Sequence, residues 1–419
     1  MHALIVGEVD VGHMGGGESI VHGLVRGLSE LSHGEDRYTV LCTPAMAEEL
    51  RPWMGGALRA ISRPPASPTS MERLKSALGP ARRPLGRLFR KIAGRAEQGL
   101  PHEVPPLDPF IREQACDVVH FMIPIHYTSG DGKVVFSFHD LQHEHLPHLF
   151  DASHIGYRRM IYDTVSREGA AIVAGSRVAA DDFRERHAPP AGKMFVARWA
   201  SYVGAGKDEP LLAQDEEVLA SIPPRFLLYP AYSYAHKNHR GLLRALSIAI
   251  REHGAAMPLV CTGGRSDEWQ RILREWRELA PRPQLIDLGH TRRALLSALY
   301  RRARIVVFPT LFEGAGLPLI EAAQLGTPIA CSDIPPLREY GGDAPLYFDP
   351  RSPQDMAAKL AMLWRNDDLR ERIAARAAIA VRDLTWARCA ATYRAIYRLV
   401  AGTALTPGDE QLLRDSRVD

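Results

Sequence analysis

Residues 308–339, FPTLFEGAGLPLIEAAQLGTPIACSDIPPLRE, contain the pattern that decides the fold. The apolar run before Pro309 predicts a buried strand that this proline ends. Pro318 suits the first turn of a helix, because its missing N–H needs no partner there. Gly326 suits the end of the same helix. The segment therefore predicts a strand, a glycine-containing loop and a short helix over about residues 318–325.

Two glutamates flank the predicted turn, Glu313 in the loop and Glu321 in the first turn of the helix. The unpaired amides of residues 316–319 should attract an anion, because free N–H groups and the helix dipole both favour negative charge. Carboxylates would repel that anion if they pointed at it, and their natural partners are hydroxyl groups. Phosphate-binding amides beside two such carboxylates predict a receptor for a sugar nucleotide. Glu321 taken alone is equally well explained as compensation of the helix dipole.

The same alternation of strand and helix continues on both sides of this segment. In the second half, apolar runs at residues 225–231, 258–263, 284–289 and 304–310 are each followed by a turn and a helical pattern. In the first half, strands are predicted at residues 3–6, 38–41, 117–121, 134–138 and 170–173. Such alternation is typical of parallel α/β sheets. The predicted fold class is α/β, with two Rossmann-like domains that face each other across a cleft.

The domain boundaries follow from breaks in this pattern. We expect an N-terminal domain over residues 1–203, with an irregular basic insertion at about 63–109, and a C-terminal domain over residues 204–384. The stretch DEEVLASIPP, residues 215–224, is interpreted as part of the junction. Residues 385–402 predict a helix that crosses back to the first domain, and residues 403–419 predict a flexible tail. Ligands of such sheets meet the carboxyl ends of the strands, so the site is expected in the cleft.

Composition excludes several classes of protein. The chain has 419 residues, 46% of them hydrophobic and 24% charged, as in ordinary globular proteins. A net charge of +3 is too small to indicate a nucleic acid partner. The five cysteines form no CxxC pair, which favours a reducing compartment over disulfides or a zinc site. The chain shows neither a signal peptide nor an apolar run of membrane-spanning length, so we expect a cytoplasmic protein.

Four segments together resemble one known family. Residues 309–350, which include the E-x7-E spacing of Glu313 and Glu321, resemble the signature of the family-four (group 1) retaining GT-B glycosyltransferases. Three further segments resemble this family in the same order along the chain: GGGESIVHGLVRGL at 15–28, FSFHDLQHEHLPHLF at 136–150 and FLLYPAYSYAHKNHRGLLRAL at 226–246. The resemblance covers nearly the whole chain and is weakest at about residues 45–115, where acceptor specificity is usually encoded.

The resemblance implies roles for residues of the C-terminal domain. Glu321 would bind the ribose hydroxyls of the nucleotide, and Lys237 would place its ammonium group on the diphosphate. Glu313 would hold hydroxyls of the transferred sugar. The distal phosphate would be held with the help of the amides near Ala315, Gly316 and Leu317.

The N-terminal domain would supply the other wall of the site. The resemblance implies that His139 lies by the sugar ring at the reaction centre and that Gly15 and Gly16 close the site. The chain departs from the family where a Gly-Arg pair is frequent, because it has Ala231 and Tyr232 there. Lys237 must then carry more of the phosphate charge, unless another cation replaces the arginine. The family often has a bulky residue at position 315, so Ala315 is expected to widen the sugar pocket.

The charge developed in such a transfer points to a mechanism without a metal. A leaving diphosphate needs preorganised positive charge, which a lysine and a helix N-terminus supply. No convincing DxD motif is present, since Asp181 and Asp182 are adjacent on a predicted helix and face different directions. We expect metal-independent transfer of a hexose with retention and without a cofactor. Resemblance to bacterial surface-polysaccharide mannosyltransferases makes GDP-mannose the first candidate donor and a glycan or lipid-linked glycan the acceptor.

Two other functions remain open at this stage. A GT-B epimerase acting on a UDP-sugar would share the fold and the phosphate site. A non-catalytic sugar-nucleotide-binding subunit would share the fold without the reaction. A glycosidase is disfavoured, since its two carboxylates must flank one anomeric carbon at about 5 Å or 6.5–9.5 Å, whereas Glu321 is predicted at the nucleotide end.

Two clusters of charged or titratable residues have competing explanations. Residues 139–148 contain four histidines, which can bind zinc, although no cysteine and no regular helical spacing accompanies them. Residues 82–95, RRPLGRLFRKIAGR, carry six basic residues and no acid. They predict either a helix in peripheral contact with an anionic membrane or a helix packed on its own domain with a solvated basic face.

Overall fold

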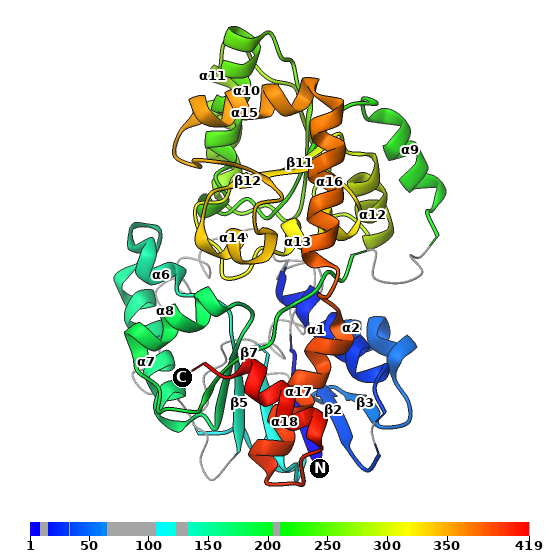
Figure 1. Cartoon of the computed structure of the whole chain (residues 1–419), viewed down its shortest axis with the longest axis vertical. Helices are drawn as coiled ribbons and strands as arrows, with labels where there is room; N and C mark the ends of the chain where they lie inside the picture. Colours follow the sequence, from blue (N-terminus) through cyan, green and yellow to red (C-terminus); the bar gives the residue numbers. More distant parts are fainter. Residues whose placement is uncertain (9–15, 33, 65–105, 123–132, 204–209, 419) are drawn as a thin grey trace, which may run out of the picture.

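The structure of the protein is a computed structural model. It describes residues 1–8, 16–32, 34–64, 106–122, 133–203 and 210–418. Figure 1 shows two α/β bodies stacked along the long axis of the molecule, each built around its own sheet. We call the body with the first sheet the N-terminal domain and the body with the second sheet the C-terminal domain.

The sheet of the N-terminal domain has seven parallel strands in the order β3-β2-β1-β4-β5-β6-β7. Its strands are β1 (His2–Val6), β2 (Arg37–Leu41), β3 (Leu58–Ile61), β4 (Val118–Phe121), β5 (Val134–Phe138), β6 (Ala171–Ala174) and β7 (Met194–Val196). Its helices are α1 (Gly16–Ser29), α2 (Pro44–Leu50), α5 (Pro109–Arg112), α6 (Gln142–His145), α7 (Ala152–Glu168) and α8 (Arg177–His187). Every residue of the central strands β4, β5 and β6 is buried, as expected for a parallel sheet covered on both faces.

The sheet of the C-terminal domain has six parallel strands in the order β10-β9-β8-β11-β12-β13. Its strands are β8 (Leu227–Pro230), β9 (Leu259–Thr262), β10 (Leu285–Asp287), β11 (Ile305–Phe308), β12 (Ile329–Ser332) and β13 (Leu346–Phe348). Its helices are α9 (Ala213–Ser221), α10 (His239–His253), α11 (Glu268–Glu278), α12 (Arg293–Arg302), α13 (Leu317–Gln324), α14 (Pro335–Gly341), α15 (Pro353–Arg365) and α16 (Asp367–Val381). The predicted fold class, two parallel α/β sheets facing each other, is confirmed.

Some elements differ from the sequence-based expectation. Four strands were not predicted: β3 and β7, at the two edges of the first sheet, and β12 and β13 of the second sheet. Of residues 215–224, interpreted as part of the junction, residues 215–221 belong to the helix α9, which comes between β7 and β8 in the chain. Its first turn is stabilised by Asp215, whose carboxylate accepts the amide of Leu212 at 2.9 Å and a hydrogen bond from Arg292 at 2.6 Å.

The helix α17 (Trp386–Ala401) follows α16 out of the C-terminal domain and lies in the N-terminal domain, as Figure 1 shows. Its first residue, Trp386, donates a hydrogen bond from Nε1 to the carbonyl of Ser201 at 3.0 Å. Further along, the hydroxyl of Tyr393 bonds with Ser137 on β5 at 2.8 Å, and that of Tyr397 bonds with His120 on β4 at 2.6 Å. All of these side chains are buried, so the end of the chain is part of the core of the first domain.

The predicted flexible tail is wrong for most of its length. Residues 407–416 form the helix α18 (Pro407–Ser416), and Asp409 makes a capping box with Thr406. The carboxylate of Asp409 is fully buried and accepts a hydrogen bond from Arg398 of α17 at 2.6 Å. The amide of Val418 then donates to the carbonyl of Met194 on the edge strand β7. The polar residues of this segment, from which we predicted a frayed end, instead form the helix cap at Thr406 and the ion pair of Asp409 with Arg398.

Two predictions concern parts of the chain that are not described. Most of the basic insertion, including residues 82–95, lies outside the described residues, as does Gly15. Within the described residues, no helix combines the length and the apolar character that crossing a membrane requires.

The contact between α1 and α17 gives a test of the packing. A β-carbon on Gly27 of α1 would lie 2.2 Å from the carbonyl oxygen of Trp386, which is backbone and therefore has little freedom to move. We expect Gly27→Val to lower the free energy of unfolding by about 3 kcal/mol in urea titrations. The control is Gly156→Ala on α7, where no neighbouring atom lies within 4 Å; there we expect a gain of about 0.5–1 kcal/mol. Equal effects of the two substitutions would contradict this packing.

Candidate functional site

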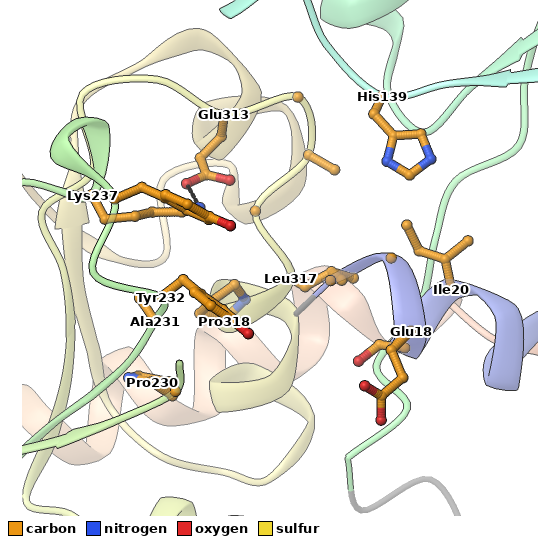
Figure 2. Close-up of a pocket in the computed structure, with 18 of the residues that line it drawn as sticks. Glu18, Ile20, His139, Pro230, Ala231, Tyr232, Lys237, Glu313, Leu317 and Pro318 are labelled. Atoms are coloured by element: carbon orange, nitrogen blue, oxygen red, sulfur yellow. Dashed lines mark hydrogen bonds and ion pairs between the residues drawn. The ribbon is translucent and has the colours of Figure 1, made fainter. Parts of the chain in front are cut away.

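A cavity of ≈ 880 Å³ lies between the two domains, at the carboxyl ends of their parallel strands. Its walls come from the loops after β5, β8 and β11 and from the first residues of α1 and α13. Figure 2 shows these walls facing each other, with Lys237, Glu313 and Tyr232 on one side and His139, Ile20 and Glu18 on the other. Strand ends from both sheets thus meet in one space.

The start of α13 is shaped by Gly316. This residue has a φ of 103°, in the region that only glycine adopts without strain, and a β-carbon there would lie 2.3 Å from Leu337. The helix then begins at Leu317, with Pro318 in its second position. Leu317 is the first helical residue, and its amide has no acceptor within its own helix. The predicted anion-attracting helix start therefore lines the cavity together with Ala315.

Glu321 lies deeper than the sequence predicted. Because α13 begins at Leu317, Glu321 is its fifth residue and falls in the second turn, so the predicted first-turn position is wrong. Its side chain lines the cavity but is only 7% exposed. Tyr300, on α12, donates a hydrogen bond to its Oε2 at 2.5 Å. Burial raises the pKa of Glu321 to about 7, although the bond from Tyr300 acts in the opposite direction.

Lys237 and Glu313 form an ion pair in the cavity wall, with Nζ and Oε1 2.5 Å apart. The loop of Lys237 is fixed by Asn238, which adopts a left-handed backbone conformation and begins α10. The amide group of Asn238 donates to the carbonyl of Pro309 at 3.0 Å. One asparagine therefore holds the loop after β8 to the loop after β11, which brings the lysine and the glutamate together.

His139 follows β5 directly and faces the cavity from the N-terminal domain. Its Nε2 lies 2.8 Å from the carbonyl oxygen of Met122. A carbonyl can only accept, so Nε2 carries a proton and Nδ1 of the neutral ring is an acceptor. Burial lowers the pKa of His139. The ring is therefore neutral at physiological pH.

The two domains approach each other closely at two glycines. A β-carbon on Gly16, the first residue of α1, would lie 3.3 Å from the side chain of Leu317, so the starts of α1 and α13 are adjacent. A β-carbon on Gly314 would lie 1.9 Å from the carbonyl oxygen of His139. The loop that carries Glu313 thus touches the backbone beside His139, and the predicted site residues of both domains, except Gly15, surround one cavity.

Sequence reasoning missed three aromatic rings in the wall. Tyr232, Tyr234 and His236 line the cavity at alternate positions of the loop after β8. Neighbouring rings are nearly parallel, with centroids 5.2 Å and 5.9 Å apart. Burial lowers the pKa of His236 to about 3, so this ring is uncharged at neutral pH. The alternation of YSYAH was visible in the sequence, but nothing there showed that residues 235–237 form a 3₁₀ helix and that His236 lies beside Tyr234.

Among the described residues, one group of side chains brings three possible metal ligands together: Glu18, His22 and Glu49, whose ligand atoms lie within 4.8 Å of one another. The Nδ1 of His22 lies 3.0 Å from the carbonyl oxygen of Glu18, and its Nε2 lies 2.8 Å from the carboxylate of Glu49. Protein acceptors therefore engage both ring nitrogens, and we assign no metal to this group.

The four histidines of residues 139–148 do not form such a group in the part of the chain that the structure covers. His143 is buried among aromatic rings, including that of Tyr162 at 5.6 Å. His145 instead bonds to Asp182 at 2.8 Å and stacks on Phe312 of the other domain. Since these rings have different neighbours, the geometry does not favour the zinc interpretation.

Comparison with known proteins agrees with this geometry. Residues 214–379 match the family described as "Glycosyl transferases group 1". This part of the chain is a group 1 glycosyltransferase domain. It contains Lys237, Glu313 and Glu321, and the matched segment includes the whole second sheet.

Several curated relatives of the glycosyltransferase domain are named mannosyltransferases, and two others are named D-inositol 3-phosphate glycosyltransferases. The chain is 32% identical over 179 residues to the O-antigen chain mannosyltransferase B of Escherichia coli, an alignment that covers 42% of this chain and 46% of that protein. It is 28% identical over 125 residues to the O-antigen chain mannosyltransferase RfbU of Salmonella typhimurium, covering 30% and 34% of the two chains. The chain thus spans less than half the length of either relative.

Solved structures with the same fold cover nearly the whole chain. The Anabaena protein Alr3699/HepE, crystallised with UDP and glucose, superposes with a TM-score of 0.67 at 14% identity, covering 94% of this chain and 98% of that one. WaaG, a glycosyltransferase involved in lipopolysaccharide biosynthesis, gives a TM-score of 0.64 at 13% identity, covering 96% and 100%. The fold of the protein is therefore GT-B.

The raised pKa of Glu321 predicts a specific pH dependence of stability. The folded pKa of about 7 exceeds the ordinary value of 4.5, so the folded state binds the proton more tightly than the unfolded state. The resulting stabilisation is complete below about pH 4.5 and is lost as the pH rises through 7. Glu321→Gln removes this titration. We expect the variant to gain about 2 kcal/mol relative to the wild type between pH 5 and pH 8.

Urea titrations of both proteins at pH 5 and pH 8 measure this difference, because the other carboxyl groups titrate equally in both and cancel. Parallel pH profiles for wild type and Glu321→Gln would show that the Glu321 carboxyl titrates normally.

Proposed function

We propose that the protein transfers a hexose, with retention, from a nucleotide diphosphate sugar to a glycan or lipid-linked glycan. The observation that carries the proposal is the Lys237–Glu313 pair beside the start of α13. The pair belongs to the group 1 glycosyltransferase domain and lines the cavity between this domain and the N-terminal domain. A cation, helix amides and hydroxyl-seeking carboxylates in one space match the parts of a sugar nucleotide.

The leaving diphosphate would lie between Lys237 and the amides of Gly316 and Leu317. The predicted set of free amides at 316–319 is smaller in the structure, because Pro318 has no N–H and the amide of Leu319 donates to the carbonyl of Gly316 at 3.0 Å. As the bond from the anomeric carbon to the phosphate oxygen breaks, negative charge develops on that oxygen, and the fixed N–H groups and the ammonium stabilise it. In the structure, the ammonium is paired with Glu313. Donor binding would exchange this partner for a phosphate oxygen and free the Glu313 carboxylate to accept hydroxyls of the transferred sugar.

Glu321 and His139 would act at the two ends of the donor. Glu321, buried behind the helix start, would accept the ribose hydroxyls of the nucleotide. His139 would lie by the sugar ring with Nδ1 as an acceptor, since its Nε2 proton is held by Met122. The new bond from the acceptor oxygen would form on the face that the phosphate leaves, and a phosphate oxygen would take the acceptor's proton. No step of this scheme requires a metal ion.

The names of the relatives support a choice of donor. Curated relatives are called O-antigen mannosyltransferases, which favours mannose and, with it, GDP-mannose as the first candidate. A structural neighbour was crystallised with UDP-glucose, so UDP-sugars form the second set to test. Surface-polysaccharide synthesis is the process in which we place the reaction.

The proposal predicts a loss of transfer without a loss of folding. Lys237→Ala and Glu313→Gln should each lower the transfer rate by at least about 100-fold, because each removes a group that contacts the reacting part of the donor. The assay measures release of nucleotide diphosphate in the presence of acceptor, and circular dichroism follows unfolding. The matched control is Lys359→Ala, a surface lysine paired with Asp355 on α15, which should leave the rate unchanged.

A thermal-shift and calorimetric screen of GDP, UDP and their sugars identifies the donor before the acceptor is known. Transfer that persists in Lys237→Ala would refute the role of this residue. Conversion of the donor in the absence of any acceptor would instead indicate epimerisation.

We also propose a peripheral contact between residues 82–95 and an anionic membrane, which would bring the enzyme to a lipid-linked acceptor. The support comes from the sequence, where six basic residues accompany an apolar face. The protein should co-sediment with vesicles containing phosphatidylglycerol, and replacing the six basic residues by glutamine should abolish this binding. Equal sedimentation with purely zwitterionic vesicles would contradict the proposal.

A further inference from the structure

One carboxylate of the C-terminal domain caps a helix of the N-terminal domain. Glu339 on α14 accepts the amides of Arg177 and Val178, the first two residues of α8, each at 2.9 Å. These amides have no acceptor within their own helix, and a negative charge there also complements the helix dipole. Separation of the domains would break both charge-assisted bonds at once, so the contact favours the arrangement of the domains in this structure, which we call the closed form.

The same helix start reaches the loop that carries Glu313. Ser176, the residue that caps α8, donates its hydroxyl proton to the carbonyl of Gly314 at 2.5 Å. Its Oγ also accepts the amide of Ala179, so the hydroxyl is held in one orientation. Gly314 is pressed against the carbonyl of His139, where no β-carbon fits. The position of the Glu313 loop relative to His139 is therefore set by a contact between domains.

Neighbouring contacts make this arrangement specific. Tyr340, next to Glu339, is 1% exposed and donates a hydrogen bond to the carbonyl of Gly175. Its hydroxyl also accepts the amide of Trp199 at 3.2 Å. The guanidinium group of Arg198 lies 4.7 Å from the centre of the Tyr340 ring. Two consecutive residues of α14 thus contact the backbone of the segment that follows β6 and of the segment that follows β7.

We propose that Glu339 and Ser176 are positioning residues that stabilise the closed form and hold the Glu313 loop against His139 in the geometry needed for transfer. Neither residue lines the cavity, so both act through the loop and not on the substrate. The inference rests on the proposed transferase function. It implies that breaking the contact slows the reaction and leaves nucleotide binding, which the C-terminal domain supplies, nearly unchanged.

The test compares Glu339→Ala, Glu339→Gln and Ser176→Ala with the control Asp343→Asn. Asp343 is four residues beyond Glu339, 87% exposed, and paired only with Arg338 of its own domain in the described structure. The readouts are kcat and KM for the sugar nucleotide, the Kd for GDP or UDP by calorimetry, and the radius of gyration by small-angle scattering.

We expect Glu339→Ala and Ser176→Ala to lower kcat by about tenfold or more, because each removes hydrogen bonds made only in the closed form. The Kd of the nucleotide should change by less than about threefold. Glu339→Gln keeps one acceptor oxygen and should lie between alanine and wild type, while Asp343→Asn should match wild type. The radius of gyration of nucleotide-bound Glu339→Ala should exceed that of the wild type.

Two results would overturn the inference. An unchanged kcat in Glu339→Ala would show that the contact does not position the loop. Loss of kcat and of nucleotide affinity together, with an unchanged radius of gyration, would show local damage to the C-terminal domain. Absence of transfer in the wild type would refute the proposed function and not this contact, because scattering and nucleotide binding test domain closure independently of turnover.

Discussion

The absence of a side chain at Gly314 sets how closely the two domains approach. A β-carbon there would overlap the carbonyl oxygen of His139, and a backbone atom at the end of a buried strand has little freedom to move. Because this glycine follows Glu313 directly, the same contact fixes the distance between the carboxylate of one domain and the imidazole of the other. The start of α13, the loop that carries Lys237 and the carboxyl ends of the strands line the cavity next to this contact.

Lys237 and the two histidines His139 and His236 add no net positive charge to the site. Lys237 is neutralised by Glu313, and burial keeps both His139 and His236 uncharged at neutral pH. The pKa of Glu321 lies near 7, so part of its population is neutral as well. In the proposed reaction, Glu313 would turn to a sugar hydroxyl, and the ammonium of Lys237 would then become available to the diphosphate. The neutral histidines and the raised pKa of Glu321 both follow from burial, since low exposure penalises every unpaired charge.

The chain end completes the N-terminal domain and thereby limits how the domains can move. Trp386 is bonded to Ser201 in the connection between the sheets, and Tyr393 and Tyr397 anchor α17 in the core beneath the first sheet. Any opening of the cleft must therefore act on the start of α17, which the bond from Trp386 to Ser201 holds to the chain after β7. On the opposite side, Glu339 and Ser176 join α14 and its neighbouring loop to α8.

Much of the fold was predictable because each buried strand of a parallel sheet is a short apolar run. Local rules also placed the end of one strand at Pro309 and the two ends of the next helix near Pro318 and Gly326. The same local rules failed at Glu321, because the helix begins one residue earlier than predicted and the glutamate therefore falls in its second turn. They also failed in the tail, where Arg398 supplies the partner of Asp409. The sequence by itself determined two parallel α/β sheets and a glycine-led helix start beside two glutamates, because these depend on neighbours a few positions away. Only the tertiary structure decided that Lys237 meets Glu313, that burial raises the pKa of Glu321, and that Glu339 caps α8, because these contacts join residues that are brought together only by packing.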